Sequence, residues 1–203
     1  ALRRRLALLR REIGSPWPDV SDAGLAARAE ELLGASMAEP VLKPIGVDQL
    51  RGLLPWPEAA RLDELVPERL EVPSGSRIRV DYPEVGTAAE GGAQATADVD
   101  RAADVDGAAA AAREQAAPPV LAAKLQECFG LADTPALVDG RVPVQLQLLS
   151  PAGRPLAVTQ DLRSFWDGPY AQVRAEMRGR YPKHPWPEDP WTAQATKRTN
   201  RRK

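Results

Sequence analysis

The residues best suited to chemistry gather near the carboxyl end of the sequence. Residues 174–203 hold nine Lys or Arg against three acids, a net charge of +6, with three aromatic rings among them. Cations bind phosphates and aromatic rings stack on bases, so this mixture suits single-stranded nucleic acid. The candidate nucleic-acid-binding residues are Arg178, Arg180, Lys183, Lys197, Arg198, Arg201, Arg202 and Lys203. A solvated basic tail explains the same composition equally well, and both interpretations stay open.

Residue types that commonly catalyse reactions are scarce. The chain has one histidine, His184, and one cysteine, Cys128. His184 lies between prolines that favour an extended backbone, which indicates a packing or hydrogen-bonding role rather than that of a general base. Cys128 lies among apolar residues, as is typical of a buried, inert thiol. A phosphate-binding loop requires Gly-Lys followed by Ser or Thr, and no lysine here follows a glycine. We therefore predict no active site and no metal site.

Bulk composition describes a globular chain without an obvious partner. The 203 residues are 43% hydrophobic and 27% charged, and 27 basic residues against 28 acidic ones give a net charge of -1. No global positive charge therefore indicates a nucleic-acid partner. The apolar runs are far shorter than the ~20 residues needed to cross a bilayer. A single cysteine excludes an internal disulfide and a multi-cysteine metal site.

The first 70 residues are predicted to be helical. One apolar stripe of an amphipathic helix is formed by Leu2, Leu6, Leu9 and Ile13. Because this pattern is already under way at the first residue, we expect further protein to precede it. Asp22 is predicted to cap a second helix over 22–33, with Gly34 as its stop. Shorter helices are expected over 48–54 and 57–66.

The tripeptide Pro-Trp-Pro, followed by an acid, occurs three times, at residues 16–19, 55–58 and 185–188. Proline at the first helical position, an acid in the first turn and a preceding apolar residue are typical of a helix start. We therefore predict a helix start at each copy. We expect the three tryptophans to pack internally, because Trp buries a large area, the alternative being platforms for stacked bases.

Residues 71–117 combine a strand with a long insertion. Ile78, Val80 and Tyr82 alternate with polar residues after a turn at 73–76, which predicts a half-buried strand. Residues 86–117 hold fourteen alanines, no aromatic residue and six acids against two arginines. Such a segment buries too little apolar surface to offset its ordering entropy, so we predict a disordered insertion. We expect a short linker in its place to leave the fold intact.

Regular structure is predicted to resume at residue 119. A helix is expected to present Leu121, Leu125, Cys128 and Phe129 on one face and to end at Gly130. Alternation predicts a strand over 142–149, a turn over 150–155 and a return strand from residue 156. Asp161 is predicted to cap a helix that carries Phe165 and Trp166 in the core, with Gly-Pro at 168–169 starting a second helical segment. The fold class is therefore α+β, with an N-terminal helical segment followed by a small β-α-β-β-α unit.

The carboxyl end is predicted to consist of an ordered strap and a free tail. Four prolines within residues 178–190 restrict the backbone, so little entropy remains to be lost on docking. Tyr181 and Trp186 are expected to anchor this strap on the α+β unit, with Lys183 and His184 directed to solvent or to a partner. Residues 192–203 carry five positive charges and no apolar anchor, which indicates a basic tail.

Several of these blocks resemble the C-terminal region of the HrpB-type ATP-dependent helicases, bacterial members of the DEAH/DExH-box group. The strongest likeness is in residues 140–166 (GRVPVQLQLLSPAGRPLAVTQDLRSFW) and 178–190 (RGRYPKHPWPEDP). Shorter blocks at 17–22, 72–82, 124–130 and 197–203 follow the same pattern in the same order. The resemblance implies a bacterial, cytoplasmic protein with RecA-like motor domains upstream that bind ATP and Mg²⁺. The motor motifs have no counterpart here, and residues 84–118 depart from the few-residue connection usual in the family.

The resemblance and the residues together give one hypothesis and two rivals. We expect an auxiliary region of an HrpB-like helicase, without ATPase activity or a cofactor of its own, that docks on motor domains in the same polypeptide. We expect its further partner to be single-stranded RNA or DNA, and we expect no membrane partner. The rivals are an independent nucleic-acid-binding module and a protein–protein scaffold. The expected domains are a helical segment (1–70), an α+β domain (71–190) and a disordered basic tail (191–203).

Overall fold

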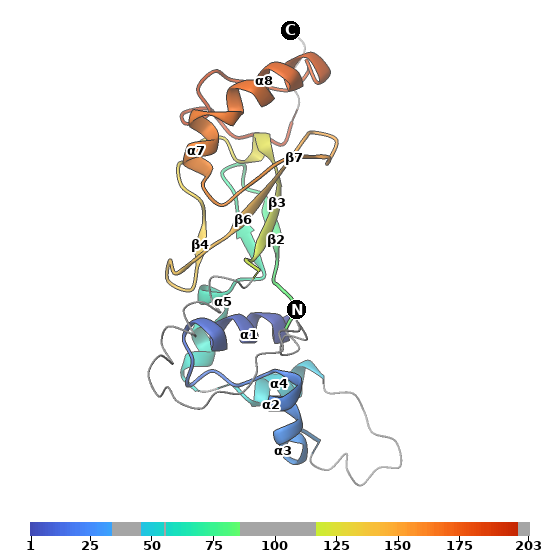
Figure 1. Ribbon diagram of the computed structural model, residues 1–203, viewed down its shortest axis with the longest axis vertical. Coiled ribbons are helices and arrows are strands. Elements are labelled where there is room, and N and C mark those ends of the chain that lie inside the picture. Colours follow the sequence, from blue (N-terminus) through green and yellow to red (C-terminus); the bar gives the residue numbers. More distant parts are fainter. Residues whose placement is uncertain (34–45, 55, 86–116, 199–203) are drawn as a thin grey trace, which may run out of the picture. The chain divides into compact units, whose positions relative to one another are not determined.

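The computed structural model describes residues 1–33, 46–54, 56–85 and 117–198 (Figure 1). The chain divides into two compact units, one made of Ala1–Leu62 with Tyr82–Ala117, the other of Asp63–Asp81 with Pro118–Lys203. The first boundary thus falls after Leu62, whereas the sequence placed it at residue 70. Apart from residue 117, the insertion predicted over 86–117 lies outside the described residues, as does the predicted stop at Gly34.

The first unit is helical in its described part. Its elements are α1 (Leu2–Glu12), α2 (Asp22–Ala27), α3 (Ala29–Leu33), α4 (Val47–Gly52) and the 3-10 turn η2 (Glu58–Arg61). The amphipathic first helix is confirmed: Leu2, Leu6 and Leu9 are buried. Arg3 of α1 donates from Nε to the carbonyl oxygen of Val20 at 2.7 Å and pairs with Asp22 at 2.6 Å. These contacts hold the start of α2 against α1.

The cap of the second helix differs from the prediction. Ser21, not Asp22, is the N-cap, and its Oγ accepts a hydrogen bond from the Gly24 amide at 3.0 Å. Ser21 takes the extended backbone that a capping residue needs, so the shorter side chain reaches the free amide and Asp22 becomes the first helical residue. The helix is also interrupted at Arg28, so the predicted 22–33 helix is two short helices.

The Pro-Trp-Pro copies do not act as helix starts in the predicted way. No helix begins at residues 16–19 or 185–188, and the copy at 55–58 leads only into η2, followed by α5 (Leu62–Leu65). Trp17 and Trp186 are buried, at 2% and 8% exposure, as the packing interpretation predicted. Trp56 is 82% exposed, so that interpretation is wrong for this copy.

The second unit is built on a five-stranded mixed sheet in the order β1-β2-β3-β6-β7. Its strands are β1 (Arg69–Glu71), β2 (Arg77–Asp81), β3 (Val120–Lys124), β6 (Gln145–Leu149) and β7 (Pro155–Thr159). β3 pairs in parallel with β6, and the other neighbours are antiparallel. Asp81 and Val120 are register partners, so the chain leaves and rejoins the sheet at one place. The predicted α+β class is confirmed.

The helix predicted over 121–130 is wrong. Residues 120–124 form β3, and only the 3-10 turn η3 (Leu125–Glu127) follows. β3 hydrogen-bonds to a strand on each side, and such pairing outweighs the helical preference of Ala and Leu. The predicted core is nonetheless right, because Leu121, Leu125, Cys128 and Phe129 are fully buried.

Two hairpins frame the sheet. The turn at 73–76 joins β1 to β2, and Gly75 takes a φ of 74° there. The strand β1 was not predicted from the sequence. The strand predicted over 142–149 is divided in two: β6 belongs to the five-stranded sheet, whereas β5 (Val142–Pro143) pairs with β4 (Ala136–Leu137) in a separate two-stranded sheet. The turn over 150–155 leads into β7, with the Ser150 amide donating to the Arg154 carbonyl at 2.7 Å.

Two helices, α7 (Leu162–Asp167) and α8 (Pro169–Arg180), lie together at one end of the sheet (Figure 1). Asp161 caps α7 as predicted, with Oδ1 accepting from the Ser164 amide at 3.0 Å. Hydrogen bonds from the Ser164 hydroxyl and the Ser164 amide lower the pKa of Asp161. An aromatic cluster fills the space beneath, and its members are Phe129, Phe165, Trp166 and Tyr170. The prediction that Phe165 and Trp166 are core residues is confirmed, since each is 4% exposed.

Candidate nucleic-acid interface

The described candidate residues run from the end of α8 into the segment that follows it. The exposed basic side chains there are Arg178, Arg180, Lys183, Lys197 and Arg198. The first two belong to the last turn of α8, and the others to residues 181–198, which we call the C-terminal segment. The remaining candidates lie outside the described residues, and they are Arg201, Arg202 and Lys203.

The C-terminal segment is ordered by hydrogen bonds to α8. Trp186 donates from Nε1 to the Tyr181 carbonyl at 2.9 Å, and Arg174 donates from Nε to the Trp186 carbonyl at 3.0 Å. Tyr170 donates from its hydroxyl to the Pro187 carbonyl at 2.8 Å. The predicted order of the strap and its Trp186 anchor are confirmed. Its predicted start is wrong, because the chain stays helical through Arg180 and leaves α8 at Tyr181.

The segment is also bonded to the turn that follows β3. The Gly130 amide donates to the Pro190 carbonyl and the Thr196 amide to the Gln126 carbonyl, each at 2.9 Å. Gly130 has a φ of 78°, and the Ala193 carbonyl oxygen lies 3.3 Å from where a Cβ would stand, so glycine suits this crossing. In contrast to the disorder expected from residue 191, residues 191–196 are thus bonded to the rest of the unit.

Most of the exposed cations are not neutralised. Arg180 pairs with Glu176 at 3.1 Å, one turn earlier on α8. Arg178, Lys183, Lys197 and Arg198 form no ion pair with any residue that the structure describes. The acids of the segment are already engaged: Glu188 pairs with Arg174 at 2.8 Å, and Asp189 accepts from the Thr192 hydroxyl at 2.6 Å. The segment and the helix end therefore present exposed cations that pair with no described acid.

Sequence reasoning missed one basic residue of this region. Lys124, the last residue of β3, is exposed, and its charge acts on His184. Burial of the imidazole, together with the nearby Lys124 ammonium, lowers the pKa of His184 below 6.5. Lys124 was overlooked because residues 121–130 were expected to be a helix. The alternation of Leu121, Ala123 and Leu125 is the signal that would have found the strand and placed Lys124 at its end.

The remaining groups with potential chemistry are buried. Desolvation raises the pKa of the Cys128 thiol to about 12, so the thiol stays protonated, in agreement with the predicted buried and inert cysteine. Burial also raises the pKa of the Tyr170 hydroxyl to about 12. This hydroxyl serves as a hydrogen-bond donor to the C-terminal segment.

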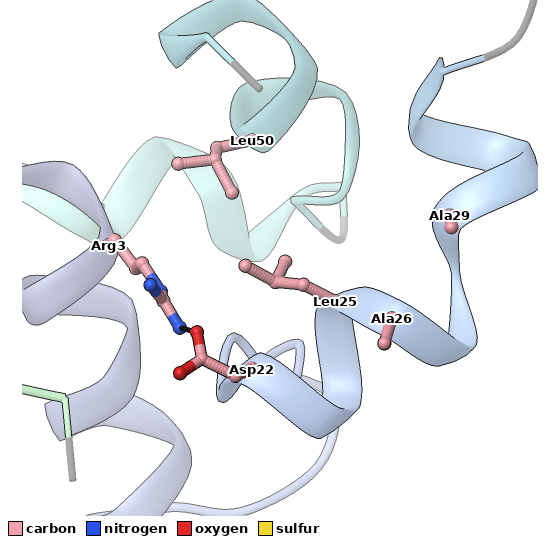
Figure 2. A pocket seen from close by; sticks show the side chains of 6 residues that line it. All are labelled: Arg3, Asp22, Leu25, Ala26, Ala29 and Leu50. Atoms are coloured by element: carbon pink, nitrogen blue, oxygen red, sulfur yellow. Dashed lines mark hydrogen bonds and ion pairs between the residues drawn. The ribbon is translucent and has the colours of Figure 1, made fainter. Parts of the chain in front are cut away.

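A pocket of about 410 Å³ in the first unit offers little chemistry (Figure 2). Its lining residues are Arg3, Asp22, Leu25, Ala26, Ala29 and Leu50. Figure 2 shows its two charged side chains turned toward each other, and they neutralise one another as an ion pair. Within residues 1–33, 46–54, 56–85 and 117–198, no cluster of three or more His, Cys, Asp or Glu is placed to hold a metal ion. Over the same ranges, no helix is long and apolar enough to cross a membrane.

Comparison with known families identifies the chain. Residues 29–110 and 93–190 match the family described as ATP-dependent helicase C-terminal (HrpB_C), and the chain belongs to this family. It is 40% identical over 190 residues to the ATP-dependent RNA helicase HrpB of Escherichia coli strain K12. That alignment covers 91% of this chain and 20% of the relative.

Two solved structures are similar to this chain. The crystal structure of the E. coli DExH-box NTPase HrpB superimposes with a TM-score of 0.74 at 38% identity, over 98% of this chain and 21% of that one. The crystal structure of the Escherichia coli DEAH/RHA helicase HrpB gives a TM-score of 0.60 at 37% identity, over 91% and 20%. The chain therefore spans about a fifth of the length of the relatives that it matches.

Proposed function

We propose that this chain acts as the auxiliary C-terminal region of an HrpB-like ATP-dependent helicase in the cytoplasm. In this role it docks on motor domains of the same polypeptide and extends the path of single-stranded nucleic acid. ATP and Mg²⁺ would bind in those motor domains, and the chain itself would hydrolyse no ATP. The family match and the coverage of only a fifth of the relatives support the docking part of this proposal.

One observation carries the nucleic-acid part. The C-terminal segment is held in place by hydrogen bonds, yet four exposed cations of the segment and the adjoining helix end lack ion pairs among the described residues. Order matters because a cation on a fixed backbone loses less entropy when it meets a phosphate than one on a free tail. Half-buried rings of Tyr181 and Trp191 lie within the same segment, where they can stack on bases.

The first test measures binding of the chain to a fluorescent oligouridylate of about 15 nucleotides, between about 50 and about 200 mM salt. Because phosphate contacts release counterions, the logarithm of the affinity should fall linearly with the logarithm of the salt concentration. The variant Lys183→Glu with Lys197→Glu should bind more weakly. Arg154→Glu is the matched control, because Arg154 is an exposed cation in the turn between β6 and β7. Equal binding by both variants would contradict the proposed interface.

The second test measures phosphate release from ATP by the purified chain, with and without RNA. We expect none above the buffer control. A turnover rate that scales with the concentration of the chain, and that survives removal of contaminating ATPases, would contradict the accessory role.

A further inference from the structure

Two basic side chains from distant parts of the sequence lie within electrostatic range of each other, in the region where the C-terminal segment passes the end of β3. Lys124 is the last residue of β3, and His184 lies in the segment near the end of α8. The Lys124 ammonium is close enough to act electrostatically on the imidazole. The imidazole is half-buried and packs edge-on against the Tyr181 ring, with the two ring centroids 6.3 Å apart.

A second lysine, Lys197, follows a residue that is bonded close to Lys124 in the sequence. The Thr196 amide donates to the Gln126 carbonyl at 2.9 Å, and Gln126 is only two residues beyond Lys124. The Thr196 hydroxyl oxygen accepts from the Arg198 amide at 3.0 Å. Lys197 therefore projects from a backbone that is held on both sides. We call Lys124, His184 and Lys197 the basic junction.

Nearby acids among the described residues are bonded to other groups and not to the lysines of the basic junction. Glu127, in the turn after β3, accepts from the Ser74 hydroxyl at 3.1 Å. Glu188 pairs with Arg174, and Asp189 accepts from Thr192. Lys124 and Lys197 form no ion pair with any residue in the described part of the chain. An anion bound between lysines that have no ion-pair partner gains attraction from each of them.

Unsatisfied hydrogen-bonding groups lie at the same place. Among the described residues, His184 Nδ1 and Gln126 Nε2 are buried without a hydrogen-bond partner, and the Gln126 residue is only 4% exposed. Buried polar groups without partners are uncommon in folded proteins and call for an explanation.

We propose that the basic junction binds a backbone phosphate of single-stranded nucleic acid. This inference rests on the proposed function and adds to it a specific site, with Lys124 and His184 as residues outside the earlier candidate set. The two ammonium groups contact phosphate oxygens, and the His184 imidazole contributes a further hydrogen bond. The Tyr181 ring beside His184 favours a nucleic acid over an acidic peptide, because bases stack on aromatic rings.

The test uses His184 as a reporter, since the chain contains one histidine and its imidazole signals are assigned without ambiguity. The His184 pKa is followed by NMR titration, alone and with saturating oligouridylate. A phosphate bound at the basic junction should raise this pKa, because its negative charge favours the imidazolium. Inorganic phosphate and polyglutamate serve as separate probes, to distinguish a free anion and an acidic peptide from a nucleic acid.

Lys124→Gln supplies the second readout. It should raise the His184 pKa in the free chain, weaken oligouridylate binding and reduce the magnitude of the log–log salt slope by about 0.7. Lys124→Arg should restore binding, and Arg154→Gln should change none of these quantities. Unchanged melting temperatures would show that the variants fold.

The outcomes separate this site from the proposed function. Binding of oligouridylate without any change at His184 overturns the basic junction and leaves the proposed interface standing. Absence of oligouridylate binding overturns both. A His184 response to inorganic phosphate alone, or equally to polyglutamate, overturns a nucleic-acid site and identifies a general anion site instead.

Discussion

Two Pro-Trp-Pro segments, one in each unit, bury their tryptophan with the same local contacts. In the first unit, Arg10 of α1 donates to the Trp17 carbonyl at 3.2 Å. In the second, Arg174 of α8 donates to the Trp186 carbonyl at 3.0 Å. In both, an arginine of the helix that precedes the motif holds the main chain at the tryptophan.

An aspartate turn follows each tryptophan. Asp19 Oδ1 accepts from the Ser21 amide, and Asp189 Oδ1 accepts from the Trp191 amide, each at 2.9 Å. The copy at 55–58 has no such arrangement among the described residues, and Trp56 is 82% exposed. The comparison teaches that the tripeptide does not determine burial of its tryptophan. Burial is accompanied instead by two hydrogen bonds. One runs from an arginine of the preceding helix to the tryptophan carbonyl, and the other runs to an aspartate from the amide two residues later.

The two segments diverge after the aspartate turn. Beyond Asp19, Ser21 caps α2, so the chain returns to a helix. Beyond Asp189, the chain runs on without regular structure, bonded to Gly130 and Gln126, and its basic side chains stay exposed. The same arginine and aspartate contacts therefore precede a helix in one unit and the candidate interface in the other.

The largest predicted effect is on Trp186. Trp186→Ala should destabilise the second unit by ~3–5 kcal/mol, because a buried aromatic side chain is lost and a cavity remains. Trp56→Ala should change the free energy of unfolding by less than ~0.5 kcal/mol, because its side chain is already in water. Urea unfolding followed by far-UV circular dichroism measures both. Similar losses for the two variants would contradict the distinction drawn between the two copies.

A smaller loss is expected for the arginine that holds the segment. Arg174→Met keeps much of the apolar stem but removes the hydrogen bond to the Trp186 carbonyl and the ion pair with Glu188, and should cost ~1.5–3 kcal/mol of unfolding free energy. Arg178→Met is the matched control on the same helix, because Arg178 is exposed and forms no ion pair with a described residue. Arg10→Met removes the corresponding hydrogen bond to the Trp17 carbonyl and should destabilise the first unit in the same way.

The next effect is a dependence of stability on pH. The folded His184 pKa lies below the value of 6.5 because of burial and the nearby Lys124 charge, so the folded chain favours the neutral ring. The unfolded chain then binds more protons, and stability should fall as the pH drops from about 6.5 through the folded pKa. His184→Gln should flatten this part of the profile. The test is to measure urea unfolding midpoints from about pH 7.5 to about pH 5, the range in which histidine titrates.

The smallest effect is expected for the two aspartate turns. Hydrogen bonds from Thr192 and Trp191 lower the pKa of Asp189, and those from Ser21 lower the pKa of Asp19. Their stabilisation is present above the unfolded pKa near 3.8 and is lost as the pH falls through the lower folded values. Asp189→Asn should therefore lessen the acid sensitivity of the second unit. If Asp19→Asn leaves acid sensitivity unchanged while Asp189→Asn reduces it, the parallel between the two turns fails.

The sequence predicted elements whose signals are local. The stripe from Leu2 to Leu9, the alternation over 142–149 and the Asp161 cap each depend on neighbouring residues, and each is found. Residues 120–124 were misjudged, because pairing with β2 and β6 determines their conformation and neither partner is adjacent in sequence. The Ser21 cap was missed because two adjacent capping residues compete, and backbone geometry decides between them.

Some residues of the candidate site could likewise be predicted from the sequence, and others only from the fold. Composition alone indicated Arg178, Lys183 and Lys197, because clustering of charge is visible in the sequence. Lys124 was invisible in that way, since it lies far from His184 along the chain and only the fold brings the two together. The Thr196–Gln126 hydrogen bond, which orders the segment beyond Trp191, also joins residues too distant for a sequence pattern to connect.

The pairing of Asp81 with Val120 has a practical consequence for protein engineering. The two ends of the connection between β2 and β3 stand side by side, so a folded domain with neighbouring termini can be spliced between them without stretching the sheet. Each doubling of the connection adds only about 0.6 kcal/mol of closure cost. A fluorescent reporter inserted after residue 85 would therefore label this chain near Val120, at the opposite end of β3 from Lys124 of the basic junction.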